Sequence, residues 1–525
     1  MTAAPAAAQR ERGADMSKRS GRGRGLTRRE FMAGVAAAAG SMALPGCGSG
    51  ATGATGVVGA SAATLPHPAD SGIDHVVVVM MENRSFDHYL GWVPGADGVQ
   101  AGVTQTDRGG TVRTSRRLAP QFQNCNLADP DHSYAGGRTQ INGGKMDGFL
   151  LTQPAGDDFP IGYYTADDLP FFKGCAENWT ICDRYFCGIL SSTTPNRFYM
   201  HAGQTDRISN TVDISTLPTI WDRMLSVGRT VAYYYTDVSY TSYWGDQYKS
   251  FSKKYDMTSF AADIASGGLP NLMFVDNVGN TVNEVGGLSM DDHPYADIRN
   301  GQAFLNQVYD ALRQSPQWSR TLLIVNYDEW GGFHDHVPPP LAPVTDQEKA
   351  AGNDGRLGCR VPCVLIGPRA RRGHVEHLQF DPNSILNLLA WRFGFEPLGA
   401  RASSNNLALA LDFERAPDPS TPAFTVPAGP FGGLCLPTGE INGADNPVPV
   451  PVPVPELPTP VGVPLPVPVQ LPPLPGLDVP LPPLPVTPAT PLLAQSAAMD
   501  EVQRRRDDHE RELDELRALG ARYGF

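Results

Sequence analysis

The chain has 525 residues, of which 41% are hydrophobic and only 18% are charged, with 55 Gly and 48 Pro. Gly and Pro together make up about a fifth of the chain, below the share that marks a low-complexity protein, so a folded core is expected. The formal net charge of −13 argues against nucleic acid as a partner, because nucleic-acid binding requires a basic surface.

The first 46 residues differ in charge from the rest of the chain. They hold eight Lys or Arg and three Asp or Glu, a net charge of +5, so the other residues carry −18. Arg28 and Arg29 stand in the string TRREFM, and an Ala- and Gly-rich apolar run follows over 33–44. This run is too short to span a bilayer comfortably, and the whole arrangement resembles a twin-arginine export signal. We therefore predict that residues 1–46 direct export.

Cys47 follows Leu44, Pro45 and Gly46 in a string that resembles a bacterial lipobox. Acylation of Cys47 would anchor the protein to a membrane, but Pro45 departs from the usual pattern, so a plain cleaved signal is an equal alternative. Residues 47–72 are rich in Ala, Gly, Thr and Ser, which predicts a flexible tether. The other seven Cys are an odd number, so at least one is unpaired, and their connectivity cannot be inferred from spacing.

Five short apolar runs are bounded by Gly, Pro, Asn or Asp, as is typical of strands buried on both faces. They are residues 75–81, 230–235, 272–275, 322–327 and 361–366. Helical patterns lie between them, for example at 298–312 and at 381–393, where Asp381 and Pro382 favour a helix start. This alternation predicts an α/β/α sandwich of three layers with a largely parallel sheet over residues 73–427.

The composition changes after residue 427. The segment 428–498 contains a stretch, 446–491, in which Pro alternates with Val and Leu. Such a sequence is incompatible with a helix or a central strand and predicts an extended spacer, which could reach across a cell wall. Residues 499–525 are highly charged and predict a solvated helix. We expect a catalytic role for neither segment.

Polar residues follow two of the predicted strands, where ligands bind in folds of this class. Glu82 and Asn83 follow the first strand, and Asp328 and Glu329 follow the strand 322–327, beside two glycines that permit close approach. Hard oxygen ligands at strand ends suggest a divalent metal, although caps of the next helix use the same residue types. An oxygen-rich site accepts Ca, Mg, Mn or Zn, so the metal is left open.

Six strings carry a resemblance to a known family. They are, in chain order, HVVVVMMENRSFDHYLG, NGGKMDG, TTPNRFYMHAG, DDHP, NYDEWGGFHDHVPPP and VEHLQFDPNSILNLL. Together they resemble the bacterial phosphoesterase family that contains phosphocholine-type phospholipases C and the related acid phosphatase A group. The resemblance covers residues 73 to about 395. It implies an alkaline-phosphatase-like fold and hydrolysis of phosphate esters at one or more divalent metal ions.

The resemblance also implies residue roles. Glu82, Asn83, Asp328 and Glu329 correspond to metal ligands. Thr193 corresponds to the nucleophile, three residues before the Asn of the PNR string, and would also contact the metal. Ser192 and Thr194 remain alternatives, because both neighbours of Thr193 also carry a hydroxyl and such a cluster also suits a helix N-terminus.

A leaving alkoxide needs a proton, and His is the natural donor. His132 and His293 stand in stretches that resemble active-site positions of the family. His336 lies beside the acidic pair and is a further catalytic candidate, with His334 and His377 as additional ones. We expect at least two of the five to be functional.

These features predict an exported, metal-dependent phospholipase C that cleaves phosphatidylcholine-like lipids through a phosphothreonine intermediate. A broad acid phosphatase is the first alternative, and a non-catalytic lipoprotein of the cell envelope is the second. Seven aromatic residues crowd the segment 233–248. Their rings could bind the quaternary ammonium group of choline, but packing within the fold explains them better.

Overall fold

The computed structural model describes residues 65–277, 286–435, 441–442 and 492–525, without the side chains of 492–496. The predicted export signal, Cys47 and the Pro-rich stretch 446–491 lie outside the described residues, as does most of the predicted tether.

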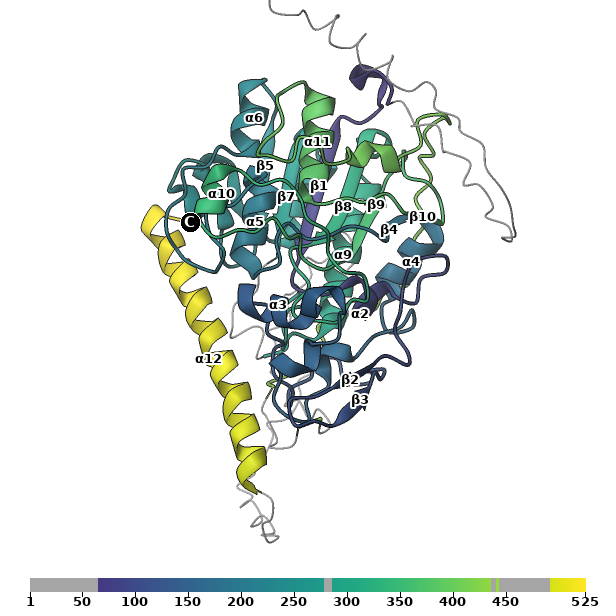
Figure 1. Ribbon diagram of the computed structural model, residues 1–525. Helices are drawn as coiled ribbons and strands as arrows, with labels where there is room; N and C mark the ends of the chain where they lie inside the picture. The colour runs from purple at the N-terminus through teal and green to yellow at the C-terminus, as the bar shows by residue number, and fades with distance from the viewer. Residues whose placement is uncertain (1–64, 278–285, 436–440, 443–491) are drawn as a thin grey trace, which may run out of the picture. The chain divides into compact units, whose positions relative to one another are not determined.

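A sheet of eight strands forms the centre of the catalytic region (Figure 1). Its strand order is β10-β4-β9-β8-β1-β7-β5-β6. The bounds are β1 His75–Met81, β4 Thr180–Cys182, β5 Val231–Tyr235, β6 Ser252–Lys254, β7 Leu272–Asp276, β8 Thr321–Tyr327, β9 Cys363–Ile366 and β10 His374–Glu376. Strand β9 is antiparallel to both of its neighbours, and the other adjacent pairs are parallel. The prediction of a largely parallel sheet is confirmed.

All five predicted strands are present, and each is off by no more than two residues at either end. Strands β4, β6 and β10 were not predicted, because three residues are too few to show a periodic pattern. A separate antiparallel pair, β2 (Thr104–Thr106) and β3 (Val112–Thr114), was also not predicted. Its alternating polar residues carry no apolar run.

Helices cover the sheet on both faces, which confirms the three-layer α/β/α class. Helix α5 (Thr193–Ala202) packs against α6 (Ile220–Ser226) and α11 (Pro382–Phe393). Helix α9 (Ile298–Arg313) packs against α4 (Pro170–Asn178) and α7 (Met257–Ala265). Shorter helices are α2 (Phe86–Leu90), α3 (Tyr134–Ile141) and α10 (Asp346–Ala350). Residues 76–79 of β1 are 0% exposed, as expected for a strand covered on both sides.

The two predicted helices begin and end as their sequences indicate. At the start of α11, the Asp381 side chain accepts a hydrogen bond from the backbone N–H of Asn383. Gly394 ends the same helix with φ 79°, a conformation that glycine adopts without strain. In α9 the apolar positions Ile298, Leu305, Val308 and Leu312 are all buried.

The C-terminal helix α12 (Leu492–Tyr523) begins before the predicted Met499 and is not solvated all round. Val502, Leu513, Leu516 and Leu519 are at most 5% exposed. Their spacing places them on one side of the helix, which packs against the catalytic region. Among the described helices, we find none with both the length and the apolar character needed to cross a membrane.

A disulfide joins Cys125 to Cys435, 310 residues apart in the sequence. The other five described cysteines are buried thiols, namely Cys175, Cys182, Cys187, Cys359 and Cys363. The disulfide ties the segment that precedes the Pro-rich stretch to the catalytic region.

Loss of this disulfide is expected to destabilise the protein. Cys435→Ser should lower the free energy of unfolding by about 2–5 kcal/mol, because the bridge closes a very long loop. Urea unfolding of the oxidised protein measures this change. Cys175→Ala is the control, since it removes one buried sulfur and should cost only about 1 kcal/mol. Alkylation of Cys125 in the unreduced native protein would contradict the assignment.

Candidate active site

Carboxylates gather at the carboxyl ends of three adjacent parallel strands. Glu82 follows β1, Asp276 ends β7, and Asp328 and Glu329 follow β8. In the sheet register, Met80 of β1 lies beside Asp276 of β7 and beside Asn326 of β8. Side-chain oxygens of Glu82, Asp328 and Glu329 therefore lie within 4.8 Å of one another, and all three residues are buried.

Asn83 completes this acidic cluster. It has φ 36°, and its backbone N–H donates to Asp328 Oδ1 at 3.2 Å. Gly331, with φ 61°, lies so close that a Cβ there would be 2.1 Å from the Asn83 carbonyl oxygen. Only glycine allows these two loops to approach in this way, as the pair of glycines after Glu329 had indicated.

The cluster contains buried oxygen atoms that accept no hydrogen bond within the part of the chain that the structure describes. Among the described residues, Asn83 Oδ1 and Glu82 Oε2 are buried without a hydrogen-bond partner. Burial raises the pKa of Glu82 well above its usual range, even though Arg197 opposes the shift. Burial likewise raises the pKa of Glu329, to about 8. Carboxylates held together in this way require nearby positive charge to remain ionised.

A divalent ion fits this donor set. Glu82, Asn83, Asp328 and Glu329 offer carboxylate and amide oxygens, which hard cations prefer. A bound ion would supply positive charge for the oxygens of a phosphoryl group. The sequence-derived ligands are thus brought together as predicted, with the identity of the metal still open.

Arg197 is a site residue that was not predicted from the sequence. It is fully buried on α5, and its guanidinium contacts Glu82 Oε1 at 2.6 Å and Asp328 Oδ2 at 3.3 Å, and also pairs with Asp276. Its presence in the PNR string was the available signal. The sequence could not reveal that three strand ends would supply its partners.

Thr193 is the first residue of α5, one turn before Arg197. It lines a pocket together with Glu82, His132 and His293. The N–H groups at a helix N-terminus and the helix dipole both favour a phosphate at this position. The Arg197 ion pairs hold this end of α5 against the acidic cluster, and Thr193 and Glu82 line the same pocket.

The two neighbouring hydroxyls are placed differently. Thr194 Oγ1 lies 3.2 Å from the Tyr243 hydroxyl, and the Thr194 backbone N–H donates to Asn210 Oδ1. Ser192 is the N-cap residue and does not line the pocket, and its side chain makes no capping hydrogen bond. Ser192 is thus outside the pocket, whereas Thr194 lines it together with Thr193, and the assignment of Thr193 as the nucleophile stays a prediction.

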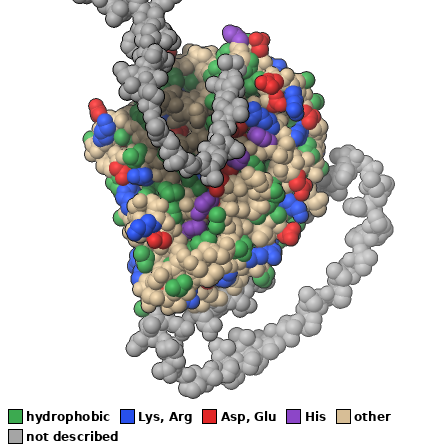
Figure 2. Space-filling model, turned by 45° about the vertical axis from the view of Figure 1, so that its right-hand side comes forward, with side chains coloured by type: hydrophobic (Ala, Val, Ile, Leu, Met, Phe, Trp, Pro, Cys, Tyr) green, Lys and Arg blue, Asp and Glu red, His purple; other side chains and the backbone are tan. Residues whose placement is uncertain are grey.

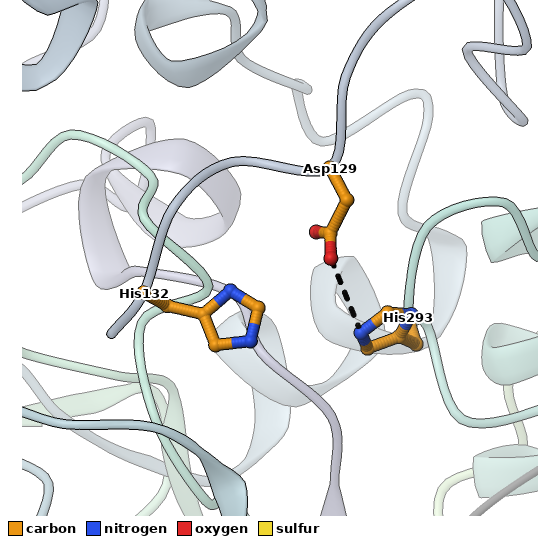
Figure 3. A group of neighbouring side chains, drawn as sticks. All are labelled: Asp129, His132 and His293. Atoms are coloured by element: carbon orange, nitrogen blue, oxygen red, sulfur yellow. Dashed lines mark ion pairs between the residues drawn. The ribbon is translucent and has the colours of Figure 1, made fainter. Parts of the chain in front are cut away.

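Asp129, His132 and His293 form a second cluster beside the acidic one (Figure 3). His293 Nε2 lies 3.8 Å from Asp129 Oδ2, and His132 Nε2 lies 3.8 Å from Glu329 Oε1. His132 therefore connects the two clusters.

The two histidines differ in their protonation. Burial lowers the pKa of His132, but the carboxylates of Glu329 and Asp129 outweigh burial and raise the pKa to about 9. Burial, with His509 and His132 as further causes, lowers the pKa of His293 well below its usual value. The charged imidazolium form is thus favoured for His132 and disfavoured for His293, which makes His132 the better candidate for a general acid.

The remaining His candidates do not line this pocket. His336 Nδ1 lies 2.7 Å from Asp87 Oδ2, and its Nε2 lies 3.1 Å from Asp97 Oδ1. These ion pairs tie His336 to two carboxylates outside the pocket that contains Thr193, and its catalytic role stays a prediction. His377 pairs with Asp183, and His334 packs against Phe149.

The chain is similar to a known family of phosphoesterases and to curated phospholipases C. Residues 73–396 match the Phosphoesterase family. The chain is 32% identical over 361 residues to non-specific phospholipase C1 of Arabidopsis thaliana, covering 61% of this chain and 67% of the relative. It is 30% identical over 486 residues to phospholipase C B of Mycobacterium tuberculosis, covering 77% of this chain and 89% of the relative. A solved alkaline phosphatase superfamily protein from Vibrio parahaemolyticus aligns with 64% of this chain and 69% of its own, at 9% identity and TM-score 0.32.

Substitutions in the hydroxyl cluster test the assignment of the nucleophile. Thr193→Ala should lower kcat by several orders of magnitude, whereas Thr193→Ser keeps the hydroxyl and should retain a substantial part of the activity. Steady-state hydrolysis of a p-nitrophenyl phosphodiester measures both. Ser192→Ala and Thr194→Ala are matched controls that should remain active. A loss of less than about tenfold in Thr193→Ala would show that another group attacks phosphorus.

Proposed function

This chain belongs to the Phosphoesterase family of hydrolases, and we propose that it is a phospholipase C acting on phosphatidylcholine-like lipids. The products would be diacylglycerol and a phosphorylated head group. The observation that carries the proposal is the pocket in which the Thr193 hydroxyl, at a helix N-terminus, adjoins Glu82 of the acidic cluster and the protonated His132.

In this reaction Thr193 reacts as its alkoxide, after its hydroxyl proton has passed to solvent. Its oxygen attacks phosphorus while the bond from phosphorus to the diacylglycerol oxygen breaks, and the alkoxide forms again when water later displaces it. His132 donates a proton to the departing alkoxide. The head group stays on phosphorus in a phosphothreonine diester, and water then attacks phosphorus to release the phosphorylated head group. In that second step His132, now neutral, accepts a proton from the water. The α5 N-terminus stabilises the phosphoryl oxygens throughout.

Two observations support a phospholipid over a simple monoester. Both of the relatives named above are phospholipases C. Tyr240 and Tyr243, from the 3-10 helix η6 (Tyr240–Trp244), line the pocket. The rest of the aromatic segment packs within the fold, as expected from the sequence. The Tyr233 hydroxyl, for example, donates a hydrogen bond to Asp276, and the Tyr234 hydroxyl donates one to Asp263.

Hydrolysis of two soluble esters tests the proposal. We expect the purified protein to hydrolyse p-nitrophenyl phosphorylcholine with a higher kcat/KM than p-nitrophenyl phosphate, and to release diacylglycerol from phosphatidylcholine vesicles. Treatment with a chelator should abolish both reactions, and readdition of the native metal should restore them, since the acidic cluster needs positive charge. A strong preference for the monoester would favour the acid phosphatase alternative.

We also propose that the protein is exported by the twin-arginine route and that Cys47 anchors it to a membrane. The sequence patterns at Arg28, Arg29 and Cys47 support this, together with a disulfide that suits an oxidising compartment. Replacing Arg28 and Arg29 with Lys should retain the protein in the cytoplasm of the host. Cys47→Ala should release active enzyme into the medium, and fractionation measures both effects. Normal export of the Lys variant would exclude this route.

A further inference from the structure

Helix α12 contributes one side of the pocket that contains Thr193. Its residues in the pocket are His509, Glu512, Leu513, Glu515 and Leu516. The helix, drawn in yellow in Figure 1, lies outside the segment that matches the family. The same pocket holds Glu82, whose Oε2 is buried without a hydrogen-bond partner in the described part of the chain. The lining of the pocket therefore combines residues of the family segment with residues of α12.

One contact links α12 to the helix of the nucleophile. Glu512 Oε2 accepts a hydrogen bond from Asn210 Nδ2 at 2.7 Å. Asn210 Oδ1 in turn accepts from the backbone N–H of Thr194 at 2.9 Å. Asn210 thus stands between the carboxylate of α12 and the first turn of α5.

Two further contacts link α12 to the histidine cluster. The His509 ring stacks on the His293 ring, with centroids 3.9 Å apart and planes 6° apart. Arg505 Nη1 donates to the Asp129 carbonyl oxygen at 2.8 Å. Three separate parts of the active site are therefore held by one helix, which a solvated helix without a role in the site would not do.

The helix is also firmly attached on either side of these contacts. Arg506 donates to the carbonyl oxygens of Cys125 and Cys435, the two disulfide residues. Arg517 pairs with Asp237 at 2.6 Å. Leu513, Leu516 and Leu519 are buried in the same apolar core as the sheet. These attachments fix the orientation of the carboxylates between them.

The pocket contains His132, whose pKa is raised, whereas the carboxylates that α12 adds to the lining are acidic. Three of its lining residues are acidic, Glu82, Glu512 and Glu515, and none is Lys or Arg. The nearby Arg197 and Arg207 lie over the rings of Tyr240 and Tyr243, and both are engaged with carboxylates. Glu82 belongs to the candidate metal ligands. Glu512 and Glu515, which are both exposed, line the pocket from α12, and Glu512 also accepts the hydrogen bond from Asn210.

On the face shown in Figure 2, side chains of both charges are interspersed. Exposed charges are screened beyond about 8–10 Å at physiological salt. The acidic wall that α12 adds to the pocket therefore acts mainly on a group that is bound close to it. Such a wall favours a cationic group and disfavours an anionic one.

We propose that α12 is a wall of the active site and that its Glu512 and Glu515 determine specificity by selecting a phosphodiester with a cationic head group. This inference rests on the proposed phospholipase C function. In that reaction the head group remains on phosphorus in both steps, so the same two carboxylates act on the first substrate complex and on the covalent intermediate.

The test compares p-nitrophenyl phosphorylcholine with its uncharged isostere, the 3,3-dimethylbutyl ester, in which carbon replaces the quaternary nitrogen. The measured quantity is the ratio of kcat/KM for the two esters, using the full-length protein in its metal-loaded form. Because the leaving group and shape are shared, any effect of Glu512 on the position of α5 through Asn210 cancels in this ratio.

The ratio should favour the choline ester in the unmodified protein. It should fall about threefold in Glu512→Gln and in Glu515→Gln and about tenfold in the double variant, as expected for partly exposed charge contacts. Glu510→Gln is the matched control, because Glu510 is exposed on the same helix and does not line the pocket. Its ratio should equal that of the unmodified protein.

An unchanged ratio in the double variant would overturn the inference, and so would an equal fall in Glu510→Gln, which would indicate a general charge effect. If the unmodified protein hydrolyses both esters at equal kcat/KM, the head-group inference fails while the phosphodiesterase function stands. If it hydrolyses neither ester but does hydrolyse p-nitrophenyl phosphate, the proposed phospholipase C function itself fails.

Discussion

The active site depends on one buried ion-pair network, in which Arg197 meets carboxylates from three strand ends. A guanidinium carries one positive charge, whereas Glu82, Asp276 and Asp328 can carry three negative charges. Glu329 adds a fourth acid to the same cluster. Buried charge without compensation is very costly, so the acids of this network are ionised together only with further positive charge, and otherwise some of them are protonated. This deficit favours binding of a divalent cation, and Asn83 Oδ1 and Glu82 Oε2, which have no hydrogen-bond partner among the described residues, indicate where it would bind.

The same network positions Thr193, the proposed nucleophile. Arg197 and Thr193 belong to the first five residues of α5, so an ion pair that draws Arg197 to the strand ends also fixes the helix N-terminus. The N–H groups there and the positive end of the helix dipole are then directed at the position of a phosphoryl group. One short helix thereby combines attachment, the nucleophile and anion binding.

The pKa values of His132 and His293 are shifted in opposite directions because the two rings have different surroundings. His132 faces the carboxylates of Glu329 and Asp129, which keep it protonated. His293 is stacked against His509 and is also near His132, and both of these, together with burial, disfavour its charged form. A proton donor and a neutral partner arise within one cluster because each ring has different neighbours. Helix α12 contributes to this difference through His509, although the helix follows the Pro-rich stretch in the sequence.

The sequence by itself determined the class of fold, the five long strands and the candidate metal ligands. An apolar run such as 75–81 predicts a buried strand from neighbouring residues alone. Because parallel strands bring their carboxyl ends to one edge of the sheet, Glu82 and Asp328 could be grouped without coordinates. Tertiary structure alone decided the partners of Arg197 and Asp276, the separation of His336 from the pocket and the role of α12. Each of these depends on contacts between segments far apart in the chain. The charges of α12 predict a solvated helix, and only its packing shows that Glu512 lies in the active site, because a charged residue in sequence does not reveal which cavity it faces.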